Sequence, residues 1–145
     1  MMVNCDLLSE KEEGLIQAAL LKRISNVYVY TLEYKEGLKI CAFIQLAFES
    51  SISLIITTGK LADNIVLLDE TDFYKEKDKY SLQDDVEMKV NVFKNFKKII
   101  GGKLLNVECV QKLDEEYYWQ LNFVFEKSTL HIDALIDEVE FYIIE

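Results

Sequence analysis

The chain repeats a pattern of residues after about eighty positions, and this repeat is the feature that most constrains its fold. Arg23 to Val27 is echoed by Lys103 to Val107, an offset of 103 − 23 = 80. Phe48–Glu49 is echoed by Phe125–Glu126, an offset of 125 − 48 = 77. An offset that shrinks along the chain indicates shorter turns in the second copy, because turns tolerate deletions better than strands do. Successive amphipathic hairpins also resemble one another without duplication, so both explanations stay open.

Eight segments rich in β-branched and aromatic residues alternate between apolar and polar positions, which predicts eight strands. The first four lie near residues 27–34, 38–48, 52–58 and 65–68. The second four lie near residues 104–111, 117–125, 129–134 and 139–144. Short connections such as Glu36–Gly37 and Lys127–Ser128 are typical of hairpins, so each set of strands is expected to form an antiparallel meander.

A helix is predicted before each set of strands. Ser9 and Glu12 form a capping box that begins the first helix. The second helix is predicted for residues 81–100, with Ser81 as its cap and Gly101–Gly102 as its end. The length and the caps favour a helix there, although four apolar residues also alternate as in a strand. These residues are Val86, Met88, Val90 and Val92.

We therefore expect residues 1–145 to form a single α+β domain. Two pseudo-repeated units, residues 9–68 and 81–145, would each consist of a helix followed by four strands. The strands would form antiparallel sheets with the two helices packed on them. The polar segment 69–80 would connect the two units across the surface.

The chain is acidic, with 26 acidic and 16 basic residues and a net charge of −10. This charge repels phosphate backbones, which disfavours direct nucleic-acid binding, and it favours a basic partner. It also keeps a half-hydrophobic chain soluble. No uncharged stretch is long enough to cross a membrane, and the first residues lack the pattern of a secretory signal. Cys5, Cys41 and Cys109 have no metal-like spacing, so we expect buried or free thiols in a reducing cytoplasm.

Few residues in the chain are suited to catalysis or to binding a cofactor. His131 is the only histidine and shares a strand face with Asp133. A nucleophilic site would need a cysteine beside this pair, but neither Cys41 nor Cys109 resembles an activated thiol, and we expect His131 to face solvent or a partner. Gly101–Gly102 matches neither the dinucleotide fingerprint nor the P-loop. We expect no enzymatic activity, no metal and no cofactor.

The C-terminal region combines acidic and aromatic residues. From Leu113 onward the chain has nine acidic residues and one basic residue. Tyrosine and tryptophan are enriched at protein interfaces, so this region is a candidate for binding a basic partner. An acidic, solvated sheet face would explain the same composition. The candidate partner-binding residues are Tyr117, Tyr118, Trp119, Asp137, Glu138 and Glu140.

The stretches KLLNVECV and YWQLNFVFEKSTLHIDALIDEVEFYI resemble those of immunity proteins of bacterial toxin–immunity systems, including contact-dependent inhibition. The resemblance covers the second copy well and the first loosely, and no residue-by-residue motif accompanies it. It implies a cytoplasmic immunity or inhibitor protein that binds and neutralises a basic toxin such as a nuclease.

Other interpretations remain open. The duplicated layout also resembles the Whirly and PUR-type folds, which bind single strands, although the net charge opposes that function. A small ligand-binding domain would have a pocket between its two sheets. An oligomerising module would form a homodimer through an edge strand such as residues 138–144.

Overall fold

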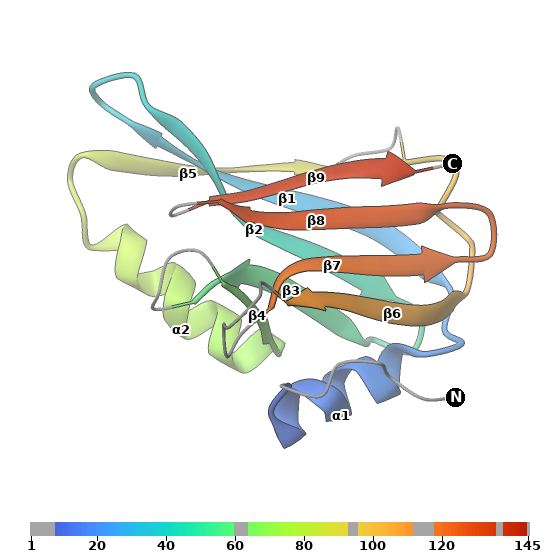
Figure 1. Cartoon of the computed structure of the whole chain (residues 1–145). Coiled ribbons are helices and arrows are strands. Elements are labelled where there is room, and N and C mark those ends of the chain that lie inside the picture. Colours follow the sequence, from blue (N-terminus) through green and yellow to red (C-terminus); the bar gives the residue numbers. More distant parts are fainter. Residues whose placement is uncertain (1–7, 60–63, 93–95, 112–117, 136–137, 145) are drawn as a thin grey trace.

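The computed structural model describes residues 8–59, 64–92, 96–111, 118–135 and 138–144, which form two stacked antiparallel sheets with two helices (Figure 1). The five-stranded sheet has the order β4-β3-β2-β1-β5, and the four-stranded sheet has the order β6-β7-β8-β9. The helices are α1 (Glu10–Ala19) and α2 (Glu70–Ser81). The strands are β1 (Ile24–Tyr34), β2 (Lys39–Phe48), β3 (Ser53–Thr58), β4 (Ile65–Leu68), β5 (Val86–Val92), β6 (Leu104–Gln111), β7 (Tyr118–Phe125), β8 (Thr129–Leu135) and β9 (Glu138–Ile144). The predicted α+β class with antiparallel sheets is confirmed.

The eight strands predicted from alternation are present, as is the first helix. Helix α1 begins as its capping box predicts. The Ser9 side chain accepts from the backbone N–H of Glu12 at 3.1 Å, and the Ser9 N–H donates to the Glu12 carboxylate at 3.2 Å. The first copy therefore has the predicted helix followed by four strands.

The helix predicted for residues 81–100 is wrong. Residues Val86–Val92 form β5, which pairs with β1 so that Met88 lies opposite Leu32. The segment expected to be a polar connection instead forms α2, because Asp69 caps it and its Phe73 side chain is buried against the sheet. The alternating residues became a strand because the unpaired edge of β1 offers ladder hydrogen bonds to an extended segment.

The two meanders share their pairing pattern. Pair β1–β2 and pair β6–β7 each have two register shifts, and the shifts fall at equivalent positions of the two copies. The shift between Ile24 and Asn26 in the first copy matches the shift between Leu104 and Asn106 in the second. The shift between Tyr30 and Thr31 matches the shift between Val110 and Gln111. Irregularities of this kind are specific features of a fold rather than general properties of hairpins. The repeat seen in the sequence thus has a counterpart in strand register.

The copies meet at an isolated antiparallel bridge between Arg23 and Lys103. We call residues 21–24 and 101–104 the seam. Four backbone hydrogen bonds cross it in two matched pairs. The Leu21 N–H donates to the Leu104 carbonyl at 2.8 Å, and the equivalent Gly101 N–H donates to the Ile24 carbonyl at 2.7 Å. The Leu104 N–H donates to the Lys22 carbonyl at 3.1 Å, and the equivalent Ile24 N–H donates to the Gly102 carbonyl at 3.0 Å. Each partner in one copy has its counterpart at the equivalent position of the other.

A single turn before the seam in the second copy corresponds to the last turn of α1. The Leu20 N–H donates to the Ile16 carbonyl at 3.0 Å, and the Ile100 N–H donates to the Phe96 carbonyl at 2.9 Å. Ile16 and Phe96 are both buried. Gly101 follows this turn with a φ of +86°, a conformation that suits glycine. Within the described residues, this turn is what remains of the predicted second helix.

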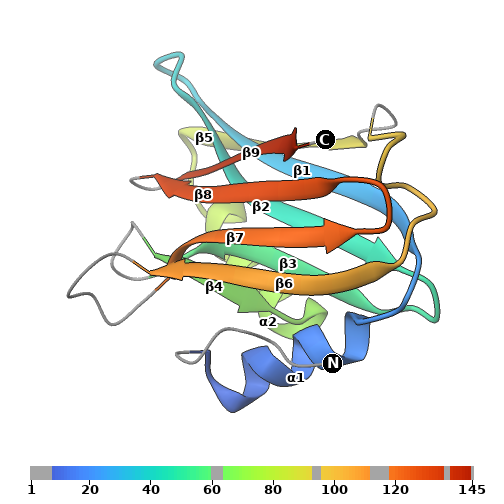
Figure 2. The ribbon, with the colours of Figure 1, turned by 45° about the vertical axis from the view of Figure 1, so that its right-hand side comes forward.

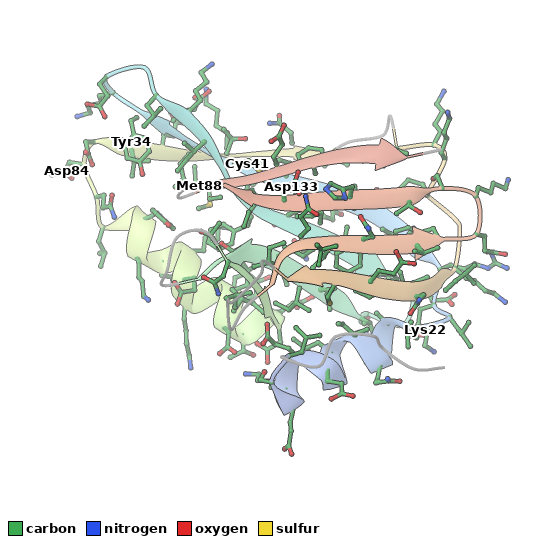
Figure 3. All side chains as sticks on the ribbon, in the orientation of Figure 1. Lys22, Tyr34, Cys41, Asp84, Met88 and Asp133 are labelled. Atoms are coloured by element: carbon green, nitrogen blue, oxygen red, sulfur yellow. The ribbon has the colours of Figure 1, made fainter. Side chains whose placement is uncertain are left out.

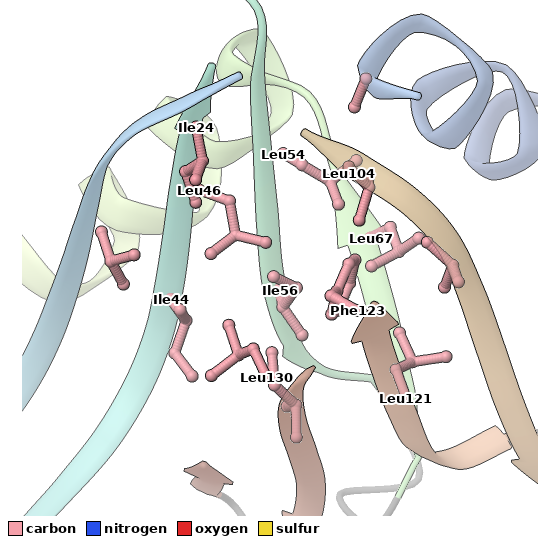
Figure 4. Close-up of a cluster of buried hydrophobic side chains, with 14 of the residues drawn as sticks. Ile24, Ile44, Leu46, Leu54, Ile56, Leu67, Leu104, Leu121, Phe123 and Leu130 are labelled. Carbon is pink, nitrogen blue, oxygen red and sulfur yellow. The ribbon is translucent and has the colours of Figure 1, made fainter. Parts of the chain in front are cut away.

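The main core lies between the two sheets (Figure 4). Apolar side chains from β1 to β4 meet those from β6 to β9, as strand alternation requires. The residues labelled in Figure 4 are Ile24, Ile44, Leu46, Leu54, Ile56, Leu67, Leu104, Leu121, Phe123 and Leu130. A smaller cluster lies on the opposite face of the five-stranded sheet, where Phe73 of α2 contacts Tyr30 and Phe43 edge to face.

Each helix has a different place on the sandwich. Helix α2 covers the outer face of the five-stranded sheet, and α1 lies along the side where β4 is the edge strand (Figure 2). The Glu12 carboxylate of α1 accepts from the Leu67 N–H of β4 at 3.0 Å, and Lys11 forms ion pairs with Asp69 and Asp72. Neither helix lies on the outer face of the four-stranded sheet (Figures 1 and 2).

Two leucines provide a matched test of the core between the sheets. Leu130 is fully buried, whereas Leu82 is 86% exposed. Leu130→Ala should lower the free energy of unfolding by about 2–5 kcal/mol, because it removes buried apolar surface and leaves a cavity. Leu82→Ala should change the free energy of unfolding by no more than about 0.5 kcal/mol. Urea denaturation of both variants measures the difference, and equal effects would contradict the arrangement of the sheets.

The pairing of β5 with β1 can be tested through Glu33. The Lys89 ammonium group of β5 lies 2.7 Å from the Glu33 carboxylate and lowers the pKa of that carboxyl, with Lys39 contributing from β2. A lowered pKa means that this contact stabilises the folded state above the carboxyl's ordinary pKa and is lost as the pH falls. Lys89→Met should therefore raise the pKa of Glu33, measured by carbon-13 NMR titration. Lys79→Met in α2 should leave it unchanged, and an unshifted titration in Lys89→Met would contradict the register.

Candidate functional site

The outer face of the four-stranded sheet carries two rows of polar side chains, and we call it the open face. Strand register places Val110, Gln120, Asp133 and Glu140 in one row across β6 to β9. The next row contains Glu108, Asn122, His131 and Tyr142. Except for Tyr142, whose backbone position alone is described, these residues alternate with the core residues of the same strands, so they face away from the other sheet.

His131 lies at the centre of this face within a hydrogen-bonded group. Its Nε2 atom is 2.8 Å from an Asp133 carboxylate oxygen, and its Nδ1 atom contacts the Asn122 amide oxygen. A carboxylate only accepts hydrogen bonds, so Nε2 is the donor to Asp133, while the role of Nδ1 depends on which atom of the Asn122 amide faces it. The residue is 6% exposed, so the expectation that it faces solvent is wrong, and a contact with a partner stays a prediction. Neighbouring side chains from β7 and β8 bury the ring, which sequence alternation alone does not reveal.

The cysteines do not complete a nucleophilic site with His131. Cys109 pairs with the core residue Leu121 across β6 and β7, so its side chain lies on the inner side of the sheet and His131 lies on the outer side. Cys41 lies on β2 of the other sheet and carries a thiol. Cys109 is disulfide-bonded. The expectation of buried or free thiols in a reducing cytoplasm is therefore wrong for Cys109, because disulfides persist mainly in oxidising compartments.

The predicted partner-binding residues are placed to different extents. Glu140 is exposed on β9, directly opposite Asp133 of β8. Glu138 begins β9, and Tyr118 and Trp119 begin β7. Register puts the starts of β7 and β9 at the same end of the sheet, because Gln120, Asp133 and Glu140 form one row. Two of the predicted residues, Tyr117 and Asp137, lie outside the described residues.

The charge of the four strands is one-sided. Their sequences contain four carboxylates and neither lysine nor arginine. The carboxylates are Glu108, Asp133, Glu138 and Glu140. Sequence reasoning missed Glu108, which is exposed on β6, and also Gln120 and Asn122 on β7. The alternation of β6 and β7 could have identified Glu108 and Asn122, because they follow the core residues Val107 and Leu121.

Other kinds of site find little support in the described part of the chain. No group of three metal-ligating side chains gathers among the residues that the structure describes. No helix within the described ranges is long and apolar enough to span a membrane. No family model matches the chain, and neither the curated proteins nor the solved structures gave a match.

Asp133 and Glu140 face each other across β8 and β9 but should contribute differently to stability. Asp133→Ala leaves a buried imidazole N–H without its acceptor and should lower the free energy of unfolding by about 1–3 kcal/mol. Glu140→Ala, on the exposed member of the pair, should stay within about 0.5 kcal/mol of the unsubstituted protein. Thermal and urea denaturation test the difference, and a neutral Asp133→Ala variant would contradict the His131 contact.

Proposed function

We propose that this protein binds a basic protein through the open face and thereby neutralises it, as an immunity or inhibitor protein does for a toxin. The observation that carries the proposal is a sheet face with no helix over it, built from four strands that contain carboxylates and no lysine or arginine. The resemblance of the C-terminal half to bacterial immunity proteins is the reason for proposing a toxin as the partner. The protein itself performs no reaction under this proposal.

Electrostatics would bring the two proteins together. The net charge of −10 attracts a basic protein over a distance, and complementary charge raises the association rate more than it raises the affinity. Exposed Glu108 and Glu140 would pair with lysines and arginines of the partner. In a nuclease, such residues hold the phosphates of the substrate, so their occlusion would stop the reaction.

Rigid positioning would make the face selective. The hydrogen bond to His131 holds the Asp133 carboxylate in place, so little side-chain entropy would be lost there on binding. Tyr118 and Trp119 begin β7 at the same end of the sheet as Glu138 and Glu140. Tyrosine and tryptophan are residue types that carry much of the binding energy at protein interfaces, which motivates their inclusion among the candidates.

Charge reversal tests the proposal. The protein is co-expressed with the toxin encoded beside it, and cell survival and complex formation are measured. Glu108→Lys with Glu140→Lys should abolish protection and slow association by about tenfold or more, because the new charges repel a basic partner. The control is Glu36→Lys with Asp84→Lys, which makes the same change of charge at exposed turns.

Two outcomes would reject the proposal. Protection that survives the open-face reversal as well as the control would exclude this face as the binding surface. The absence of protection against every toxin encoded beside it would exclude the inhibitor function itself.

An oligomerising module is the second candidate, and one observation favours it. Strand β9 is an edge strand of its sheet, and edge strands can pair with another chain through their backbone groups. Light scattering after size-exclusion chromatography distinguishes the candidates. A strictly monomeric protein at working concentration excludes the homodimer, and a stable dimer that covers β9 would remove Glu140 from the proposed binding face.

A further inference from the structure

A basic pocket lies at the seam, away from the open face. It has a volume of about 250 Å³, and its described lining includes four bases and one acid. These residues are Arg23, Lys97, Lys98, Lys127 and Glu126. Gly101 and Gly102 contribute backbone to the lining. The pocket brings together the residue before β1, the single turn before β6 and the β7–β8 hairpin.

The charge of the pocket is opposite to that of the chain. Its described lining has a charge of +3, four minus one, whereas the whole chain has −10. Glu126, the carboxylate among the described lining residues, already accepts the Lys103 N–H at 2.8 Å and lies 3.4 Å from the Arg23 guanidinium. A concave surface of one sign focuses the field on whatever occupies it. Lys22 lies at this same end of the sandwich, far from Asp84 and Met88 (Figure 3).

The backbone around the pocket is held in place. Arg23 donates from Nη1 to the Gly101 carbonyl at 2.8 Å, and Ser128 donates to the Lys98 carbonyl at 3.2 Å. Ile99, beneath the turn, is fully buried. A side chain at Gly102 would lie 3.1 Å from the Ile99 carbonyl oxygen, so this position favours glycine. These contacts fix the backbone and the Arg23 side chain on which the pocket is built.

The first copy lacks the lysines of the pocket at the equivalent positions. The offsets of the repeat, 80 at the seam and 77 at the hairpin, place Gln17, Ala18 and Ser50 where the second copy has Lys97, Lys98 and Lys127. The first copy forms the same seam hydrogen bonds and the same turn without these charges. The basic residues are therefore an addition of the second copy to a shared framework.

We propose that this pocket binds a small phosphorylated anion with two or more negative charges. The guanidinium group suits two oxygens of one phosphate, and lysines act as point charges around the others. A volume of about 250 Å³ is larger than one phosphate ion and near the lower limit of about 300 Å³ for small-molecule pockets. This size fits a compact diphosphate or a phosphorylated metabolite. The proposal does not depend on the proposed function, which uses another surface.

Sodium pyrophosphate serves as the probe, with sodium chloride added to keep the ionic strength constant. Nitrogen-15 NMR should show saturable shifts concentrated at the amides of Arg23, Gly101, Gly102 and Lys127. Isothermal titration calorimetry provides the dissociation constant. The test variant carries the first-copy residues Lys97→Gln, Lys98→Ala and Lys127→Ser. It should bind at least about tenfold more weakly, the change expected from losing one charge-assisted hydrogen bond.

The matched control carries Lys35→Gln, Lys75→Ala and Lys79→Ser, which make the same change of net charge at exposed sites on a turn and on α2. It should bind as the unsubstituted protein does. Equal weakening of pyrophosphate binding in the test and control variants would overturn the proposal, because charge screening would explain it. Chemical shifts that rise linearly with pyrophosphate and spread over the surface would overturn it for the same reason. If the test variant does not fold, the location and saturation of the shifts in the unsubstituted protein decide the question.

Discussion

The reciprocal backbone pairing at the seam is the contact on which the rest of the structure depends. Arg23 and Lys103 form its centre, and each copy both donates to the other and accepts from it. Neither meander can slide along the seam without leaving buried backbone groups unpaired, which is costly. The neighbouring residues Ile24 and Leu104 are buried, so the same pairing sets where the core between the sheets begins. Matching register shifts in both meanders are what an internal duplication predicts.

The asymmetry between the copies decides which surface is available to a partner. Helix α2 and strand β5 lie between the two meanders in the chain and have no counterpart in the described part of the second copy. Helix α2 covers the outer face of the first sheet through Phe73, and β5 extends that sheet. Neither of the described helices covers the outer face of the second sheet, where its polar residues lie. The proposed binding face follows from this insertion rather than from the repeat.

The two proposed surfaces differ in charge and in origin. Carboxylates lie on the outward positions of β6, β8 and β9, where strand alternation places polar residues. The bases of the pocket come from three segments that the seam and the β7–β8 hairpin bring together. An acidic chain can therefore present a local basic site, because fields from exposed charges are screened over about 10 Å at ordinary ionic strength. The net charge alone does not describe both surfaces.

The sequence by itself determined the elements whose signals are local. Alternation identified eight strands because one face of each is buried, and the capping box of α1 involves residues three positions apart. It did not reveal that residues 86–92 form a strand, because that choice depends on the free edge of β1. The contact of Asn122 with His131 and the gathering of Arg23, Lys97 and Lys127 also required the tertiary structure. The physical reason is common to these cases, since each depends on residues distant in sequence that only strand pairing and sheet packing bring together.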